Sequence, residues 1–173
     1  MRKSSKITLG ALLIIMIFVC FLYISNGIGT PKSRLESDAR SSQKIEDSWL
    51  MEKDVSDTMA ALIAYPEDQS DYVFSIYVDR PGLSFGYFFR GGGECAGIEN
   101  HIINLRVEGY NEHAFISMNS MSVERLEIDN GNTVKVIKID SKKPFALVLP
   151  RNAGNIAFYD VNGNIVETYQ TEL

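Results

Sequence analysis

Residues 72–89 read YVFSIYVDRPGLSFGYFF, and this stretch decides the fold class. Large apolar side chains occupy every second position in residues 72–78 and again in residues 83–89. Alternation with a period of two is typical of a half-buried β-strand. Residues 79–82 (DRPG), between the two runs, are turn formers. The stretch therefore predicts a β-hairpin with one strongly aromatic face.

Short runs of the same kind continue to the end of the chain, after a glycine break at residues 91–93. Turn-forming sequences separate several of them, including residues 129–132 and the pair Asn162 and Gly163, where we expect a type I′ turn. The pattern predicts a mainly β protein, folded as an antiparallel β-sandwich or an open barrel of about seven to nine short strands. The further strands are expected over residues 103–107, 113–118, 123–129, 133–139, 145–149, 156–160 and 164–169.

One of these runs differs from the others. Residues 145–149 (FALVL) are apolar on both faces and lie between Pro144 and Pro150. A short strand that is apolar on both sides is typical of the interior of a fold, and proline is found at the ends or edges of strands. We therefore expect a buried strand here.

The N-terminal region predicts a membrane helix. Residues 7–24 read ITLGALLIIMIFVCFLYI, and no charged residue lies between Lys6 and Lys32. A helix of this length rises about 27 Å, close to the thickness of the hydrocarbon core of a bilayer. We expect a transmembrane signal-anchor helix in contact with membrane lipid, because a helix satisfies its own backbone in lipid. The basic residues Arg2, Lys3 and Lys6 place the N-terminus in the cytoplasm.

Two alternatives concern the same segment. A cleaved signal peptide would carry the same basic residues, but its apolar run is usually shorter, and no Ala-X-Ala site follows here. Lipid attachment at Cys20 is disfavoured by the bulky Phe18 and Val19 that precede it. We predict a single-pass protein of the cell membrane with an extracytoplasmic C-terminal domain, and secretion after cleavage is the alternative.

The chain divides into four parts on these patterns. Residues 1–6 are a basic cytoplasmic tail, and residues 7–24 are the membrane helix. Residues 25–44 read as a flexible tether, and residues 45–173 as the outer β-rich domain. At the start of that domain, apolar residues at helical spacing predict a short amphipathic helix within residues 45–64.

Charge and cysteine content limit the classes of function. The formal net charge is −5, and the residues after position 24 carry 14 basic and 22 acidic side chains. An acidic domain is a poor match for phosphates, so no nucleic-acid partner is expected. Cys20 and Cys95 lie in such different settings that no intramolecular disulfide is expected. This, with the lack of an Asn-X-Ser/Thr sequon, favours a bacterial cell envelope.

Cys95 is the first candidate for chemistry, because it lies in the glycine-rich sequence GGGECAG. A nucleophilic cysteine needs a lowered pKa, and either histidine of the chain, His101 or His113, could supply the base. Glu94 beside the thiol acts in the opposite direction, and no known signature of a cysteine enzyme surrounds it. An envelope enzyme using Cys95 with His101 or His113 is therefore an alternative hypothesis. An intermolecular Cys95 disulfide is another.

No metal site or cofactor is expected. The residue types that could bind zinc lack the close pairs that zinc sites use. The glycines of residues 91–93 lack the pattern of a nucleotide-binding loop. The acidic pairs Glu124 with Glu127 and Asp68 with Asp71 are expected to be solvated, since neither lies in a calcium loop. The potential zinc ligands are Glu94, Cys95, Glu99, His101 and His113.

The aromatic strand supplies the candidate binding residues. Phe85, Tyr87 and Phe89 share one face, and Phe88 interrupts the polar side of the same strand. Such a ladder could bind a peptide or a carbohydrate, but large apolar residues are usually buried, so we expect this face to belong to the core. Tyr87, Phe88 and Phe89 are the binding candidates.

These observations favour a non-enzymatic function. We expect a membrane-anchored extracytoplasmic β-sandwich domain that acts as a binding or accessory module of the cell envelope, with an envelope protein or peptide as its partner. A structural domain that forms a homodimer through its sheet edges or through Cys95 is the remaining alternative.

Overall fold

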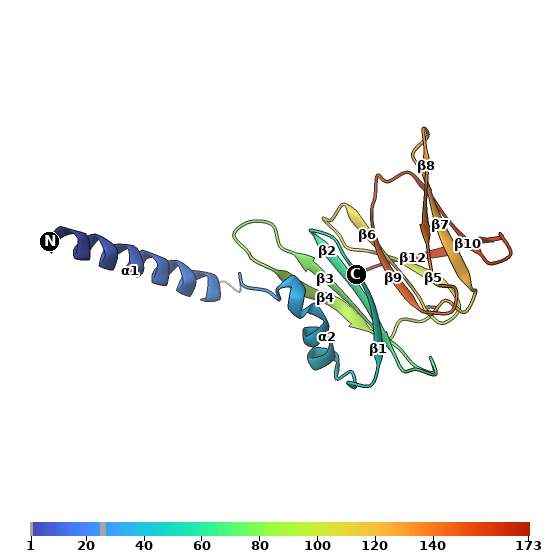
Figure 1. Cartoon of the computed structure of the whole chain (residues 1–173), viewed down its shortest axis with the longest axis horizontal. Helices are drawn as coiled ribbons and strands as arrows, with labels where there is room; N and C mark the ends of the chain where they lie inside the picture. The colour runs from blue at the N-terminus through green and yellow to red at the C-terminus, as the bar shows by residue number, and fades with distance from the viewer. Residues whose placement is uncertain (1, 25–26) are drawn as a thin grey trace.

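The protein consists of a long N-terminal helix and a body of β-sheets (Figure 1). The computed structural model describes the backbone of residues 2–24 and 27–173, and the side chains of residues 10–23 and 27–173. Helix α1 (Arg2–Ile24) projects away from the body. The short 3-10 helix η1 (Lys32–Arg34) and helix α2 (Leu35–Gln43) lie against the body of β-sheets. The prediction of a mainly β protein is confirmed.

The body contains three sheets of four strands each. The first sheet has the order β1-β2-β3-β4 and is antiparallel throughout. Consecutive strands are neighbours, as hairpin connections require. The strands of this sheet are β1 (Leu50–Val55), β2 (Met59–Tyr65), β3 (Val73–Asp79) and β4 (Tyr87–Gly93).

The second and third sheets contain the rest of the chain. The second has the order β12-β5-β6-β9, in which β12 and β5 are parallel, and the third has the order β11-β10-β7-β8. The described residues form twelve strands, more than expected, because β1 and β2 were not predicted and residues 164–169 are divided between two strands. These strands are β5 (Ile102–Arg106), β6 (Glu112–Ser117), β7 (Val123–Asp129), β8 (Val134–Lys138), β9 (Phe145–Pro150), β10 (Asn155–Asp160), β11 (Ile165–Val166) and β12 (Thr168–Glu172).

The three sheets are stacked, with the second sheet in the middle. Ile63 and Ile76 of the first sheet share a core with Ile116 of the second. Phe158 of the third sheet shares another core with Phe115, which lies on the opposite face of the second. Helix α2 covers the outer face of the first sheet. The architecture is thus a stack of three sheets, and no barrel closes among the described strands.

Strand β9 belongs to the middle sheet, and this position explains why its sequence is apolar on both faces. Phe145 and Leu149 lie in the core shared with the third sheet, whereas Ala146 and Val148 lie in the core shared with the first. Successive side chains of a strand point to opposite faces, so a strand between two sheets needs apolar residues on both. The prediction of a buried strand over residues 145–149 is confirmed.

The predicted helix over residues 45–64 is wrong, because strands β1 and β2 occupy most of this stretch. All seven residues of β2 (MAALIAY) are buried. One face packs against the second sheet and the other packs beneath α2. A short apolar run without alternation cannot be assigned to helix or strand by periodicity alone.

The expected flexible tether over residues 25–44 is also corrected for its described part. Backbone hydrogen bonds join Gly29 to Phe85 and Thr30 to Tyr87, the first residue of β4. Beyond them, α2 places Leu35 and Ala39, four residues apart, against the first sheet with no exposed surface. Two small apolar contacts in a polar segment suffice because the sheet already supplies an apolar face. Residues 25 and 26, the start of the expected tether, lie outside the described residues.

The hairpin predicted over residues 72–89 is present as β3 and β4, with a longer connection than expected. The loop covers residues 80–86, and β4 continues through residues 91–93, which were expected to break the strand. A Cβ atom at Gly92 would lie 2.5 Å from the carbonyl oxygen of Phe74. Glycine is therefore used here for a close approach of two backbones, not for a break.

The hairpin predicted around Asn162 and Gly163 is present as β10 and β11. The type I′ turn is wrong, because it needs a positive φ at both central residues and only Gly163 has one, at 81°. Asp160 organises the turn instead, since its carboxylate accepts hydrogen bonds from the backbone N–H groups of Asn162 and Asn164 at 2.9 and 2.8 Å.

Helix α1 exposes large apolar side chains around its whole circumference. From Leu12 to Tyr23 these side chains are 42–78% exposed, with the exception of the buried Leu22. No helix within the described residues is both long and apolar enough to cross a membrane. Residues 7–9 and 24 of the predicted membrane segment, and the basic residues of the predicted tail, lie outside the described side chains.

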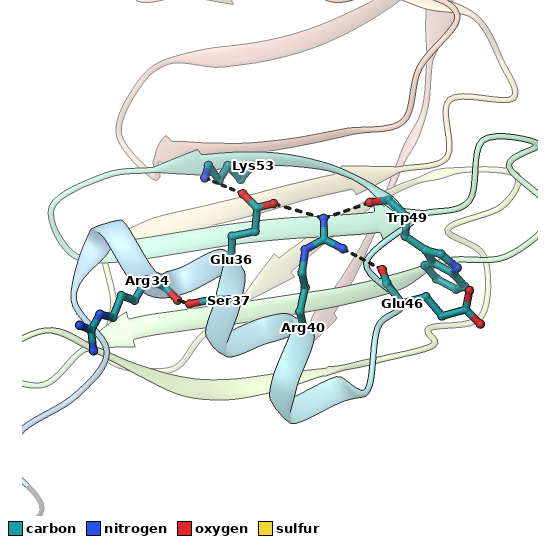
Figure 2. Close-up of polar contacts among 7 residues, drawn as sticks. All are labelled: Arg34, Glu36, Ser37, Arg40, Glu46, Trp49 and Lys53. Carbon is teal, nitrogen blue, oxygen red and sulfur yellow. Dashed lines mark hydrogen bonds and ion pairs between the residues drawn. The ribbon is translucent and has the colours of Figure 1, made fainter.

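Arg40 fixes α2 to the start of the first sheet (Figure 2). Its guanidinium donates to the carbonyl oxygens of Glu46 and Trp49 at 2.9 and 3.0 Å, and to the Glu36 carboxylate at 3.2 Å. Lys53 of β1 reaches the other oxygen of Glu36 at 3.1 Å. The hydrogen bond from Lys53 is the main cause that holds the pKa of Glu36 below its usual value.

Replacing Arg40 by alanine is expected to lower the free energy of unfolding by about 2 kcal/mol, because hydrogen bonds from a charged donor are stronger than neutral ones and two carbonyl groups lose their partner. Arg34→Ala is the matched control, since the Arg34 guanidinium points away from the cluster (Figure 2). Urea denaturation of both variants measures the difference. If both variants lost the same free energy of unfolding, the hydrogen bonds of Arg40 would not contribute specifically to stability.

Candidate functional site

A pocket opens between the edge strand β4 and the turn that joins β5 to β6. Its volume is about 450 Å³. Strand β4 supplies it with two phenylalanines and one arginine, the loop between β3 and β4 supplies a second arginine, and the β5–β6 turn supplies a tyrosine and a glutamate. The residues that matter for its chemistry are Arg80, Phe88, Phe89, Arg90, Glu108 and Tyr110.

Local structure directs both arginines to this place. The Arg80 guanidinium lies over the ring of Phe88, 4.0 Å from its centroid. Arg90 is the extra residue of a β-bulge, because Tyr77 pairs with Phe89 while Ile76 pairs with Gly91. A bulge re-aims a side chain and is common beside functional sites. Both cations are therefore placed by features other than simple strand alternation.

Tyr110 provides the opposite wall. Its hydroxyl donates a hydrogen bond to the backbone carbonyl oxygen of Asp79. Burial raises the pKa of Tyr110, Asp79 raises it further, and Arg80 and Arg90 act in the opposite direction. The phenol therefore stays neutral at physiological pH and lies within electrostatic range of both guanidiniums.

This combination of groups is suited to binding an anion that adjoins an apolar or planar group. A guanidinium stays charged at all physiological pH values and matches the geometry of carboxylate and phosphate oxygens. Phe88 and Phe89 supply apolar surface beside it. Glu108 at the same pocket would repel an anion placed next to it, which restricts where the charged group can lie.

The structure divides the three predicted binding residues. Phe88 and Phe89 line the pocket, and Phe89 is 45% exposed. Tyr87 is buried beneath α2, and its hydroxyl donates to the carbonyl oxygen of Ser56. The expectation that the face with Phe85, Tyr87 and Phe89 belongs to the core holds only for Tyr87, since Phe85 is 57% exposed.

The structure does not join Cys95 to a histidine. The ring of His101 lies 4.3 Å from that of Tyr169, and His113 hydrogen-bonds Asn104 at 2.9 Å. Cys95 packs against the core between the first and second sheets, whereas His113 stacks with Phe115 on the opposite face of the second sheet. Burial raises the pKa of the Cys95 thiol, and Glu99 raises it further, so the thiol is not activated.

The potential metal ligands do not form a metal site within the described residues. Glu99 accepts a hydrogen bond from the Tyr72 hydroxyl at 2.8 Å. In the described part of the chain, no group of three or more His, Cys, Asp or Glu side chains could hold a metal ion. The acidic pair Glu124 and Glu127 binds Arg125, at 2.9 Å in each case.

Sequence reasoning missed Arg80, Arg90 and Tyr110. One signal was available, because Arg90 directly follows the two adjacent aromatics Phe88 and Phe89. Comparison of the chain with protein-family models, curated proteins and solved structures gave no match. The fold and the pocket therefore define the protein only as a three-sheet β protein with an arginine- and aromatic-lined pocket.

Proposed function

We propose that this chain is a membrane-attached, non-enzymatic binding module of a cell envelope. Its partner binds in the pocket between β4 and the β5–β6 turn. The partner presents an acidic group next to an apolar or aromatic one, as an acidic peptide segment does. The arrangement of Arg80, Phe88, Arg90 and Tyr110 around this pocket is the observation that carries the proposal.

The proposed attachment rests on helix α1. Residues 7–24 carry no charge, and the described side chains between residues 12 and 23 expose apolar surface in every direction except at Leu22. A helix that is apolar all round is stable only where lipid or protein covers it. Attachment at a membrane also raises the local concentration at a membrane partner, so a shallow pocket need not bind tightly.

Strand β4 suits a peptide partner for a second reason. It is an edge strand of the first sheet, and the segment with Gly29 and Thr30 pairs only with its beginning. Edge strands offer backbone groups to which a peptide can add as a further strand. Side-chain recognition by Arg80 and Arg90 would then fix the register of such a peptide.

Site-specific photo-cross-linking tests the proposal in cells that produce the full chain. With p-benzoylphenylalanine at position 88, we expect one discrete adduct. The Arg80→Gln, Arg90→Gln double substitution is expected to reduce its yield about tenfold or more, because charge-assisted hydrogen bonds are lost.

The same photo-reactive residue at position 136 is the control, because Val136 is exposed on the third sheet. It should give no such adduct. An identical adduct from positions 88 and 136, or an adduct indifferent to the arginine changes, would refute binding at this pocket.

A further inference from the structure

A second group of cationic side chains lies on the face of the middle sheet that points away from the pocket. Arg106 of β5 and His113 of β6 stand directly opposite each other in the antiparallel register. Arg151, which follows β9, reaches across the β5–β6 turn, where its Nη2 donates to the carbonyl oxygen of Val107 at 3.2 Å. The three side chains therefore converge beside the same turn.

Arg106 contributes an unsatisfied donor to this group. Its Nε atom is buried, and nothing in the described chain accepts a hydrogen bond from it. A buried donor without an acceptor is costly and rare in native proteins. Glu172 of β12 stands opposite Arg106 in the parallel register, but no salt bridge joins the two side chains among the described residues.

The positive charge of the group is also unbalanced. Burial lowers the pKa of His113, and the neighbouring Arg106 and Arg151 lower it further. A hydrogen bond of 2.9 Å to Asn104 positions the ring of His113 beside the two cations. Arg151 is exposed and Arg106 is partly exposed, so a ligand from outside the chain can reach this group, and its positive charge favours an anion over water.

We infer that Arg106, Arg151 and His113 form a binding site for a phosphate group. A guanidinium binds phosphate oxygens through paired hydrogen bonds, and a phosphate can engage two guanidiniums at once. A phosphate group carries about 1.5 to 2 negative charges at neutral pH, which matches two arginines better than the single charge of a carboxylate. The site lies on a different face from the pocket of Arg80 and Arg90, so it does not depend on the proposed function.

The test is a titration of the full-length chain in detergent micelles with inorganic phosphate, followed by NMR. We expect a saturable shift of the Arg106 Nε–H signal and a rise in the pKa of His113, since a bound anion offsets the two cations. His101, which lies against Tyr169, is the internal control and should not change. Arg106→Lys, which keeps the charge but lacks Nε, should weaken phosphate binding about tenfold.

Arg125→Lys is the matched control, because Arg125 already binds Glu124 and Glu127 on the third sheet. It should bind phosphate as the unsubstituted protein does, and acetate should bind more weakly than phosphate. An Arg106 Nε–H signal that does not respond to phosphate would overturn the inference, even if Arg106→Lys failed to fold. Equal affinity for acetate would overturn the assignment of phosphate.

Discussion

Replacing Phe158 by alanine is expected to lower the free energy of unfolding by about 3–5 kcal/mol. Phe158 is 1% exposed and lies between Phe115 and Phe145, with ring centroids 5.3 and 5.9 Å away. Removal of the ring leaves a cavity where the third sheet packs on the second, and strands on either side of it cannot close the gap. Chemical denaturation measures the loss, which is a large part of the about 5–15 kcal/mol of a typical domain.

The neighbouring Tyr159→Ala variant separates this core effect from a general effect on β10. The Tyr159 ring lies on the opposite face of the strand, beneath the Arg125 guanidinium at 4.3 Å. Its loss should cost about 1 kcal/mol, as for a partly exposed cation–π contact. Amide hydrogen exchange should accelerate in β7 and β10 of Phe158→Ala. If both variants lost the same stability, the core between the second and third sheets would be less important than its packing indicates.

The strands that could be predicted are those with a visible alternation or a clear turn. The hairpin β3–β4 and the run from β5 to β10 follow from such patterns. Strand β2 has neither, because it is buried on both faces and consists of Ala, Leu, Ile, Met and Tyr. Helix α2 could not be predicted from its composition, since only Leu35 and Ala39 are apolar, and their packing partners lie on the first sheet, far along the chain.

The candidate site was half predictable for a related reason. The aromatic residues Phe88 and Phe89 stand out in the sequence, and both border the pocket. The positions of Arg80 and Arg90 depend on a seven-residue loop and on a β-bulge, neither of which leaves a clear pattern in the sequence. Tyr110 reaches the pocket from the β5–β6 turn, and the sequence does not show that this turn lies beside β4.

The second large effect is expected in helix α1. If α1 is inserted in lipid, as we propose, the double substitution Ile14→Arg, Ile17→Arg should shift the full-length protein from the membrane fraction to the supernatant. Arginine near the centre of a membrane helix costs about 2.5–3.5 kcal/mol on insertion scales, so two would reduce insertion by a thousandfold or more. Ile14 and Ile17 are 68% and 61% exposed, so the body should stay folded. Sedimentation followed by immunoblotting measures the distribution.

The control must also replace two exposed apolar residues by arginine, but outside α1. Val134→Arg with Val136→Arg does so, because these residues of β8 are 55% and 53% exposed. It should remain in the membrane fraction. Extraction with alkaline carbonate then shows whether α1 is covered by lipid or by another protein. A helix inserted in lipid resists extraction, whereas a helix bound to a protein surface does not. Unsubstituted protein that stays in the supernatant without detergent would rule out attachment through α1, because apolar surface buried in lipid cannot leave it unaided.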